Sequence, residues 1–167
     1  MDRNIKLEDI TIRTELHPGD IGYVTYMHGH LYKNEYGYGI SFEAYVAMGF
    51  YEFYKNYDPR KDGVWIAEHN SKIAGFLLLM HRENNEAQLR YFILDPAYRG
   101  LGLGKKMAAY FMDHLKVNGY KSSFLWTTNE LFTAAHIYKK MGYTLTEEVP
   151  STAFGKQLKE QRYDLVL

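Results

Sequence analysis

Cysteine is absent from the chain of 167 residues. Its absence excludes disulfide bonds, a thiol nucleophile and thiolate zinc sites. An excess of one charge is also lacking, because 20 lysine and arginine residues balance 20 aspartate and glutamate residues. Binding to a phosphate backbone needs a basic excess, so nucleic acid is not expected as the main partner.

Long hydrophobic runs are missing as well. No apolar stretch approaches the roughly 20 residues that a membrane-spanning helix needs, and residues 1–6 lack the apolar segment of a secretory signal. We therefore expect a soluble, cytoplasmic protein that does not bind a membrane. The length, with a hydrophobic fraction of 46%, indicates one folded domain over residues 1–167 with a sizeable core.

Metal-ligand patterns are scarce. His28 and His30 form the close pair among the seven histidines, but residues two apart on a helix do not face each other. No third ligand and no His-Glu-x-x-His pattern accompanies them, so no metal site is expected. Tyrosine, in contrast, is abundant, and many of the 16 tyrosines lie within residues 23–57. They predict either the cover of a helical pair or a substrate pocket with aromatic walls.

Residues 88–106 combine a strand, a glycine-rich turn and the start of a helix. An apolar run over residues 89–94 leads into a turn with Gly100, Gly102 and Gly104, and helical spacing of apolar residues follows. The first N–H groups of a helix have no internal partner and carry partial positive charge. Glycine lets an anion approach these groups closely. The stretch therefore predicts an anion-binding turn.

Two well-known phosphate motifs do not fit this turn. A Walker A motif would need glycine where Arg99 stands and serine or threonine where Lys106 stands. The dinucleotide fingerprint fails because the glycines alternate as Gly-x-Gly-x-Gly, and no strand with an acidic end follows at the expected distance. A nucleotide-binding domain is therefore disfavoured. A tight turn that binds no ligand remains the structural alternative.

The spacing Arg-x-x-Gly-x-Gly, at Arg99, Gly102 and Gly104, resembles the pyrophosphate-binding motif of the GNAT acyltransferases, which use acyl-CoA. Residues 134–143 are similar to that family's Ala-x-x-x-Tyr-x-x-x-Gly-Phe/Tyr signature. The expected order of elements is a strand, two helices, three antiparallel strands, a helix, a strand, a helix and two strands. This order also matches the family. The resemblance implies an α/β (α+β) fold whose central mixed, mostly antiparallel sheet is flanked by helices.

The activity that the resemblance implies is N-acetylation of a primary amine of a small molecule or peptide. Acetyl-CoA would be the cofactor, and the amine would attack it directly in a ternary complex. The alternative is a non-catalytic acyl-CoA-binding regulatory module of the same fold. Residues 17–47 resemble a narrower subgroup that is often fused behind a MarR-type repressor, so we expect the free-standing acyltransferase half. Family members often dimerise, which makes a homodimer a further expectation that nothing in the sequence decides.

The resemblance also assigns the cofactor residues. Backbone amides of the turn would cradle the pyrophosphate, and backbone of the preceding strand would pair with the pantetheine arm. The side chains of Arg99 and Lys105 would add charge, with solvated surface charges as their alternative role. The residues expected at the cofactor are Phe92, Ile93, Leu94, Arg99, Gly100, Leu101, Gly102, Leu103, Gly104 and Lys105. Many members have asparagine where Leu131 stands here. Asn129, two residues earlier, is the expected substitute, with a helix cap as its alternative role.

Tyr138 matches the tyrosine that the family uses to protonate the leaving thiolate, a suitable role for a neutral phenol. Its alternative is a core tyrosine. The acceptor amine is expected near His28, Tyr32 and Glu35 on a lid, and the alternative for each of these residues is a surface or capping role. Arg90 is expected to bind a carboxylate of the substrate. Its alternative role is an ion pair with a neighbouring acid.

A side-chain base is less clearly indicated. Glu68, Glu83 and Glu86 lie near strand ends, and none matches a family position firmly. A water relay or attack by an already neutral amine would need no such residue.

Overall fold

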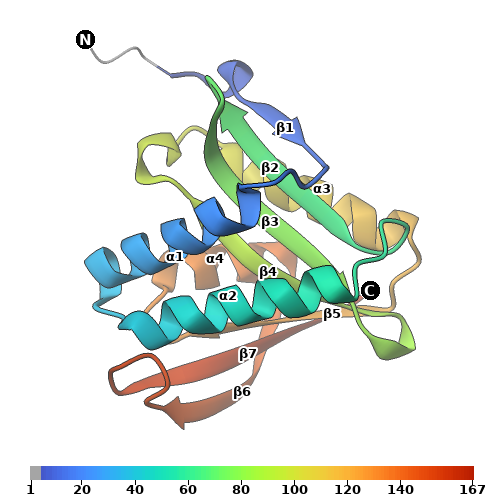
Figure 1. The fold of residues 1–167 in the computed structure, drawn as a ribbon. Helices are drawn as coiled ribbons and strands as arrows, with labels where there is room; N and C mark the ends of the chain where they lie inside the picture. Colours follow the sequence, from blue (N-terminus) through green and yellow to red (C-terminus); the bar gives the residue numbers. More distant parts are fainter. Residues whose placement is uncertain (1–4) are drawn as a thin grey trace.

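The computed structural model describes residues 5–167 and contains one seven-stranded sheet with four α-helices (Figure 1). The strands are β1 (Thr11–Arg13), β2 (Gly63–His69), β3 (Lys72–His81), β4 (Glu86–Leu94), β5 (Ser122–Thr128), β6 (Thr144–Ser151) and β7 (Leu158–Val166). The helices are α1 (Asp20–Tyr36), α2 (Ile40–Lys55), α3 (Leu103–Val117) and α4 (Phe132–Met141). The sheet order is β1-β2-β3-β4-β5-β7-β6, and only the β4–β5 pair is parallel. The expected mixed sheet and order of elements are confirmed.

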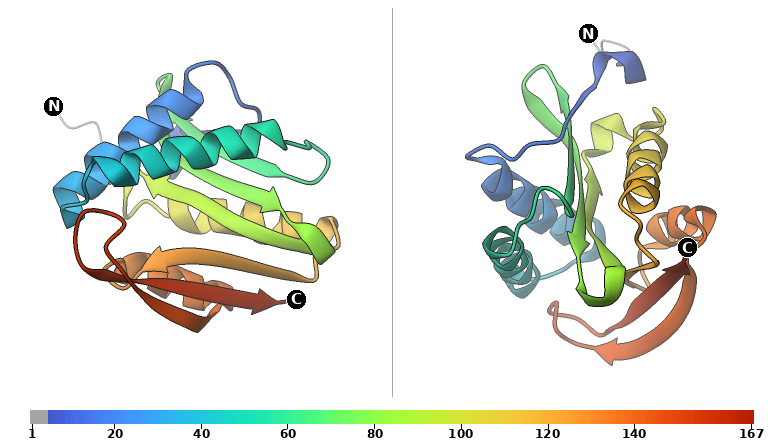
Figure 2. Two further views of the ribbon diagram at one scale, coloured as in Figure 1. Left: turned by 60° about the horizontal axis from the view of Figure 1, so that its bottom comes forward. Right: turned by 90° about the vertical axis from the view of Figure 1, so that its right-hand side faces the viewer.

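The helices cover both faces of the sheet. Figure 2 shows α1 and α2 on one side of the edge-on sheet and α3 and α4 on the other. Each side has its own apolar cluster, around Phe50 and Phe76 under α1 and α2, and around Met107 and Leu77 under α3 and α4. The central strand β3 is buried on both faces, which explains its nearly continuous apolar run.

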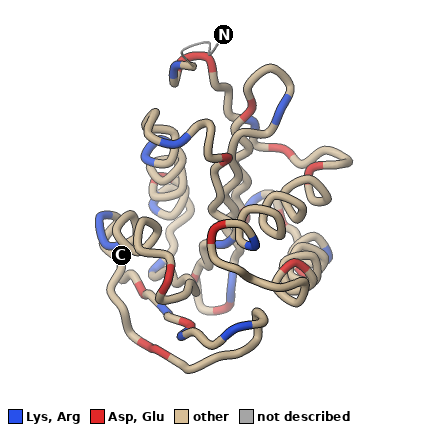
Figure 3. The backbone as a smooth tube through the Cα atoms, turned by 90° about the vertical axis from the view of Figure 1, so that its left-hand side faces the viewer, with Lys and Arg blue, Asp and Glu red and all other residues tan. Residues whose placement is uncertain are grey.

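Charge is dispersed over the described residues. Figure 3 shows lysine and arginine interspersed with aspartate and glutamate along the chain, in keeping with the balanced composition. Within residues 5–167, no helix is long and apolar enough to cross a membrane.

Two predicted N-caps are wrong. Asp20 and Ser41 are short polar residues that precede apolar helical patterns, so the sequence predicts them as the N-caps of α1 and α2. Gly19 and Gly39 instead occupy the N-cap positions, without a side-chain cap bond. The Asp20 carboxylate instead pairs with Arg13, with a nitrogen–oxygen distance of 2.8 Å, and accepts a hydrogen bond from a nearby backbone N–H. A buried carboxylate needs a partner, and this one is paired with a guanidinium of β1, so it does not cap the helix.

The sequence also predicts Thr128 or Asn129 as the N-cap of α4, and the structure corrects this. Leu131, and neither Thr128 nor Asn129, holds the N-cap position. Asn129 Oδ1 accepts a hydrogen bond of 2.8 Å from the Lys159 backbone N–H, so this side chain ties β5 to β7.

The strands β4 and β5 separate soon after they begin. Their parallel pairing covers three positions and ends where Gln88 faces Phe124. From there to its end at Leu94, β4 remains paired with β3 on its other edge only. The N–H and C=O groups that point toward β5 from residues 89–94 therefore have no strand partner within residues 5–167. This opening is where an extended ligand can pair with the sheet.

A β-bulge in β4 shapes the sheet beside this opening. The register with β3 shifts between the pairs Leu78–Arg90 and Phe76–Ile93, and Tyr91 has a positive φ of 57°. The shift interrupts the alternation of faces, so Arg90 and Tyr91 both lie on the side of α1 and α2. The Tyr91 ring stacks on Phe50 of α2, with 4.1 Å between the ring centroids.

Gly49 of α2 allows the helix to lie close to this bulge. A Cβ at this position would collide with the Tyr91 hydroxyl and come within 2.8 Å of Arg90 Nη2. We expect Gly49→Ala to lower the free energy of unfolding by about 1–3 kcal/mol in urea denaturation, because the overpacked side chain is buried. Tyr91→Phe, which removes the colliding oxygen, should recover at least half of that loss in the double variant.

Gly22 of α1 is the matched control for this prediction. A Cβ there has no neighbour within 4 Å, so Gly22→Ala should be neutral or slightly stabilising. Equal losses at the two helical glycines would contradict the packing argument.

Candidate active site

A cavity of about 440 Å³, the larger of two that border Tyr138, lies between α1, the end of β4 and the N-terminal ends of α3 and α4. Most of the residues expected at the cofactor contribute to its walls. It is lined by Leu31, Tyr32, Glu35, Tyr36, Phe92, Ile93, Leu94, Arg99, Gly100, Gly102, Gly104, Lys105, Leu131, Thr133, Ala134, Ile137 and Tyr138. Leu101 and Leu103 do not line it, because their side chains pack into the core under α3. Asn129 lines neither cavity.

The turn into α3 presents a row of free backbone donors. The first backbone hydrogen bond of the helix runs from the Lys106 N–H to the Gly102 carbonyl oxygen, at 3.0 Å. Within the described chain, the N–H groups of residues 100–105 donate to no backbone or side-chain acceptor. Gly100 and Gly102 have φ values of 79° and 87°, which residues with a side chain rarely adopt. The turn thus offers consecutive N–H donors and the positive end of a helix dipole to an anion.

Gly104 has a different role from the other two glycines. It lies in the first turn of α3, and a Cβ there would lie 3.3 Å from Leu94 Cδ1. The absence of a side chain therefore lets the start of the helix approach the end of β4. The row of donors, two cationic side chains and the unpaired edge of β4 fit a ligand with a diphosphate at one end and amide groups along an extended arm.

An ion pair crosses the larger cavity. Glu35 of α1 lies 2.8 Å from Arg99, measured between the carboxylate oxygen and a guanidinium nitrogen, and both side chains are partly exposed. We expected Glu35 at the acceptor amine, but it lines only the larger cavity. Its carboxylate competes with any anionic ligand for Arg99.

Removing this competitor should strengthen binding of an anionic ligand. We expect Glu35→Gln to lower the Kd of acetyl-CoA by a factor of about 1.4 to 5 in calorimetry, the range set by an exposed ion pair worth roughly 0.2–1 kcal/mol. Glu148→Gln is the matched control, since it breaks the exposed pair with Lys159 outside both cavities and should leave Kd unchanged. Weaker binding by Glu35→Gln would show that this carboxylate holds the site together.

The smaller cavity, about 110 Å³, lies between α1 and α2 on one side and β4, β5 and β7 on the other. Aromatic side chains form much of its wall. It is lined by His28, Tyr32, Tyr38, Phe42, Tyr45, Val46, Gln88, Leu89, Arg90, Tyr91, Phe92, Trp126, Thr127, Thr128, Leu131, Tyr138, Phe154 and Glu160. Four residues border both cavities: Tyr32, Phe92, Leu131 and Tyr138. The two cavities therefore meet at these side chains.

Tyr138 of α4 lies at this junction. Its side chain is 7% exposed, and its hydroxyl has no hydrogen-bond partner within residues 5–167. Burial raises the pKa of this hydroxyl above its ordinary value, because the charged phenolate is disfavoured away from water. The hydroxyl is therefore a neutral proton donor at physiological pH, free to bond to a ligand atom.

His28 of α1 lies in the wall of the smaller cavity. Its Nδ1 lies 2.8 Å from the Val24 carbonyl oxygen, which can only accept, so Nδ1 carries the proton and Nε2 is left as an acceptor. Burial lowers the pKa of His28 to about 4, despite the hydrogen bond to Val24. The imidazole is therefore neutral at pH 7 and can accept a hydrogen bond from an amine.

The glutamates considered as bases lie elsewhere. Glu68, Glu83 and Glu86 line neither cavity. Glu68 pairs with Arg13, and Glu86 accepts a hydrogen bond from Ser122.

The acidic residue in the smaller cavity is Glu160 of β7, which sequence reasoning missed. Phe154 and Trp126 were missed as well. The sequence does not indicate Phe154 as a site residue, because a single aromatic residue in a polar connecting segment forms no recognisable pattern.

Comparison with known proteins identifies the family. The model of the Acetyltransferase (GNAT) family matches residues 27–143, so the chain belongs to this family. An uncharacterised N-acetyltransferase of Escherichia coli K12, YjgM, is 30% identical over 95 residues, which are 55% of this chain and 57% of that protein. The aligned part thus spans little more than half of that relative.

Solved structures share the fold. A GNAT-family acetyltransferase from Staphylococcus aureus Mu50 has a TM-score of 0.76 at 22% identity, covering 95% of this chain and 99% of its own. YncA from Salmonella typhimurium, solved with acetyl-CoA, has a TM-score of 0.70 at 16% identity, covering 95% of this chain and 94% of its own. At these identities the likeness establishes the fold, while the substrates must be argued from the site itself.

Proposed function

We propose that the protein is an N-acetyltransferase that transfers the acetyl group of acetyl-CoA to a primary amine of a small molecule or peptide, by direct attack in a ternary complex. The observation that carries this proposal is the row of free N–H groups at residues 100–105 beside the unpaired edge of β4. These donors open into a cavity that meets a second, aromatic cavity at Tyr138. Family membership supports the same reaction.

The cofactor would occupy the larger cavity. The amides of residues 100–105 would hold its diphosphate, with Arg99 and Lys105 adding positive charge. The free edge formed by Phe92, Ile93 and Leu94 would pair with the pantetheine arm as an added strand does. Asn129 lies outside this cavity, so we assign it no contact with the cofactor.

Acetyl-CoA supplies an acetyl group activated as a thioester. A β4 amide on the open edge can donate a hydrogen bond to the carbonyl oxygen as negative charge develops there, an effect worth roughly 3 kcal/mol. The amine nitrogen forms a bond to the acetyl carbon, and the carbon–sulfur bond breaks. Tyr138 donates its proton to the departing sulfur and regains one, through water, from the acetylated nitrogen. The products are the amide and free coenzyme A.

The acceptor amine would enter through the smaller cavity. His28 Nε2 accepts a hydrogen bond from the amine, which attacks in its neutral form. Tyr32 borders both cavities and would position the amine against the thioester.

The proposal is tested by measuring free coenzyme A from acetyl-CoA in the presence of amino acids, polyamines and peptides, with acetyl-CoA binding followed by calorimetry. Amine-dependent release is expected. Tight binding without release on any amine would instead identify a non-catalytic acyl-CoA-binding module. Absence of acetyl-CoA binding would overturn both functions.

A further inference from the structure

The wall of the smaller cavity contains a half-buried guanidinium without a strong partner. Arg90 lies over the ring of Tyr91, with 4.7 Å from Cζ to the ring centroid, and 5.7 Å from that of Tyr45. Its polar contacts are weak: Nη2 lies 3.4 Å from the Tyr45 hydroxyl and Nη1 lies 4.0 Å from Met80 Sδ. A guanidinium carries five N–H donors, so most of its hydrogen-bonding capacity is unused.

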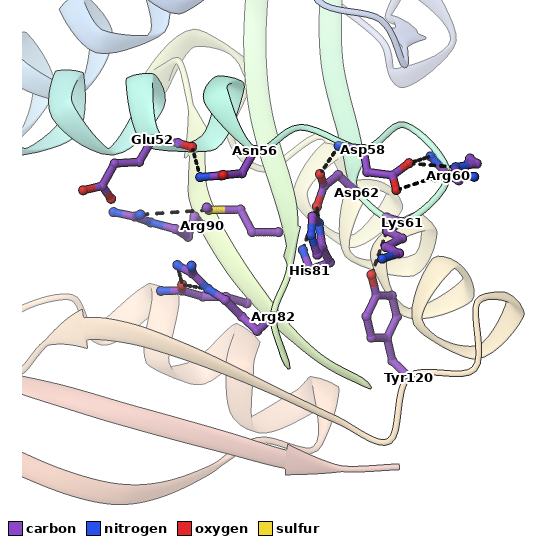
Figure 4. A network of polar contacts seen from close by, with 12 residues as sticks. Glu52, Asn56, Asp58, Arg60, Lys61, Asp62, His81, Arg82, Arg90 and Tyr120 are labelled. Atoms are coloured by element: carbon purple, nitrogen blue, oxygen red, sulfur yellow. Dashed lines mark hydrogen bonds and ion pairs between the residues drawn. The ribbon is translucent and has the colours of Figure 1, made fainter. Parts of the chain in front are cut away.

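Arg90 also differs from most of the other arginines of residues 5–167, because it forms no ion pair. Four of them have a carboxylate oxygen within 4 Å, namely Arg13, Arg60, Arg99 and Arg162. Arg82 lacks one but is exposed to water and donates to Gln88. In Figure 4 the dashed line from Arg90 ends on a sulfur atom, and Glu52 nearby makes no ion pair with it. A cation partly withdrawn from water is expected to have an anion, and here the cavity is the place for it.

The sheet side of this cavity carries a second charge, on β7. Glu160 of β7 is partly buried and forms no ion pair within the described chain. Aromatic side chains that include Tyr38, Phe42 and Phe154 line the same cavity. The cavity therefore suits a molecule with one carboxylate, one amino group and an apolar body.

We propose that the acceptor is a free amino acid with an apolar or aromatic side chain, whose carboxylate binds Arg90. This inference rests on the function proposed above and narrows its substrate class. Arg90 and His28 both contact the Tyr91 ring, His28 edge-on at 5.6 Å between centroids. A carboxylate on Arg90 therefore leaves the α-amine of the same molecule on the side of His28. His28 stacks in turn on Tyr32, which borders both cavities.

The test compares acceptors that differ only in the carboxylate. For the wild-type protein, kcat/KM with acetyl-CoA should be at least about tenfold higher for L-phenylalanine and L-leucine than for L-phenylalaninamide and L-leucinamide, the effect of a charge-assisted hydrogen-bond pair. Arg90→Gln should bring this ratio to about one. 3-Phenylpropanoate, which has the carboxylate but no amine, should inhibit the wild-type protein competitively and Arg90→Gln at least tenfold less. Arg60→Gln, which removes an exposed guanidinium outside both cavities, should keep the wild-type ratio.

The outcomes separate this inference from the function on which it rests. Amine-dependent release of coenzyme A with equal rates for acids and amides would overturn the amino-acid assignment and leave the acetyltransferase intact. An unchanged preference for acids in Arg90→Gln would overturn the role of Arg90. Binding of acetyl-CoA without release on any amine, the acids included, would overturn both.

Discussion

Replacing Tyr138 with phenylalanine should lower kcat at least about a hundredfold and leave the Kd of acetyl-CoA within about twofold, the loss typical of a general acid. The hydroxyl lies at the junction of the two cavities and has no partner within residues 5–167. Burial raises its pKa above the ordinary value of about 10, so it remains protonated through pH 9. Wild-type kcat should therefore show no alkaline decline up to pH 9 that depends on Tyr138. Steady-state release of coenzyme A and calorimetry measure the two quantities.

Tyr143 offers a matched control for this substitution. It is a buried tyrosine whose hydroxyl shares a hydrogen bond of 2.6 Å with Ser123 Oγ, and it lines neither cavity. Tyr143→Phe should cost about 1 kcal/mol of stability and leave kcat within a few-fold. If Tyr138→Phe kept the wild-type rate between pH 6 and 9, Tyr138 would be a core residue and the leaving thiolate would take its proton from water.

Gly102→Ala is the second change with a large expected effect. Its φ of 87° disfavours a side chain, and its N–H belongs to the free row at the start of α3. Relaxing the strain turns neighbouring N–H groups away from the ligand. Losing one charge-assisted hydrogen bond is worth roughly 1.5–3 kcal/mol, so the Kd of acetyl-CoA should rise about ten- to a hundredfold in calorimetry.

Gly119 is a control position that separates the effect of backbone strain from the effect on acetyl-CoA binding. It follows the end of α3 with a φ of 68°, and a Cβ there would have no neighbour within 4 Å. Gly119→Ala and Gly102→Ala should each lower the free energy of unfolding by about 1–2 kcal/mol, because both force a side chain into the left-handed region. Only Gly102→Ala should weaken the binding of acetyl-CoA. Equal Kd values for the two variants would show that the turn does not bind the cofactor.

The order of elements could be predicted from the sequence, because each helix or strand depends on residues close together in the chain. Periodicity located the strands and helices, and the glycines at positions 100, 102 and 104 indicated a turn that an anion can approach closely. A strand, a turn and a helix in succession bring free N–H groups together without help from distant residues. Helix capping was less predictable. Asp20 resembles a helix cap in the sequence, but its carboxylate forms an ion pair with Arg13 of β1, which periodicity does not reveal.

The sequence by itself therefore determined the order of elements, the family resemblance and the glycine-rich turn with its free N–H groups, since all three rest on short-range patterns. Tertiary structure decided the rest of the site. The bulge at Tyr91, the separation of β4 from β5 and the cavity wall formed by Phe154 and Glu160 depend on contacts between residues far apart in the chain. The unpaired state of Arg90 belongs to the same class, because whether a charge has a partner depends on which distant carboxylates the fold brings near it.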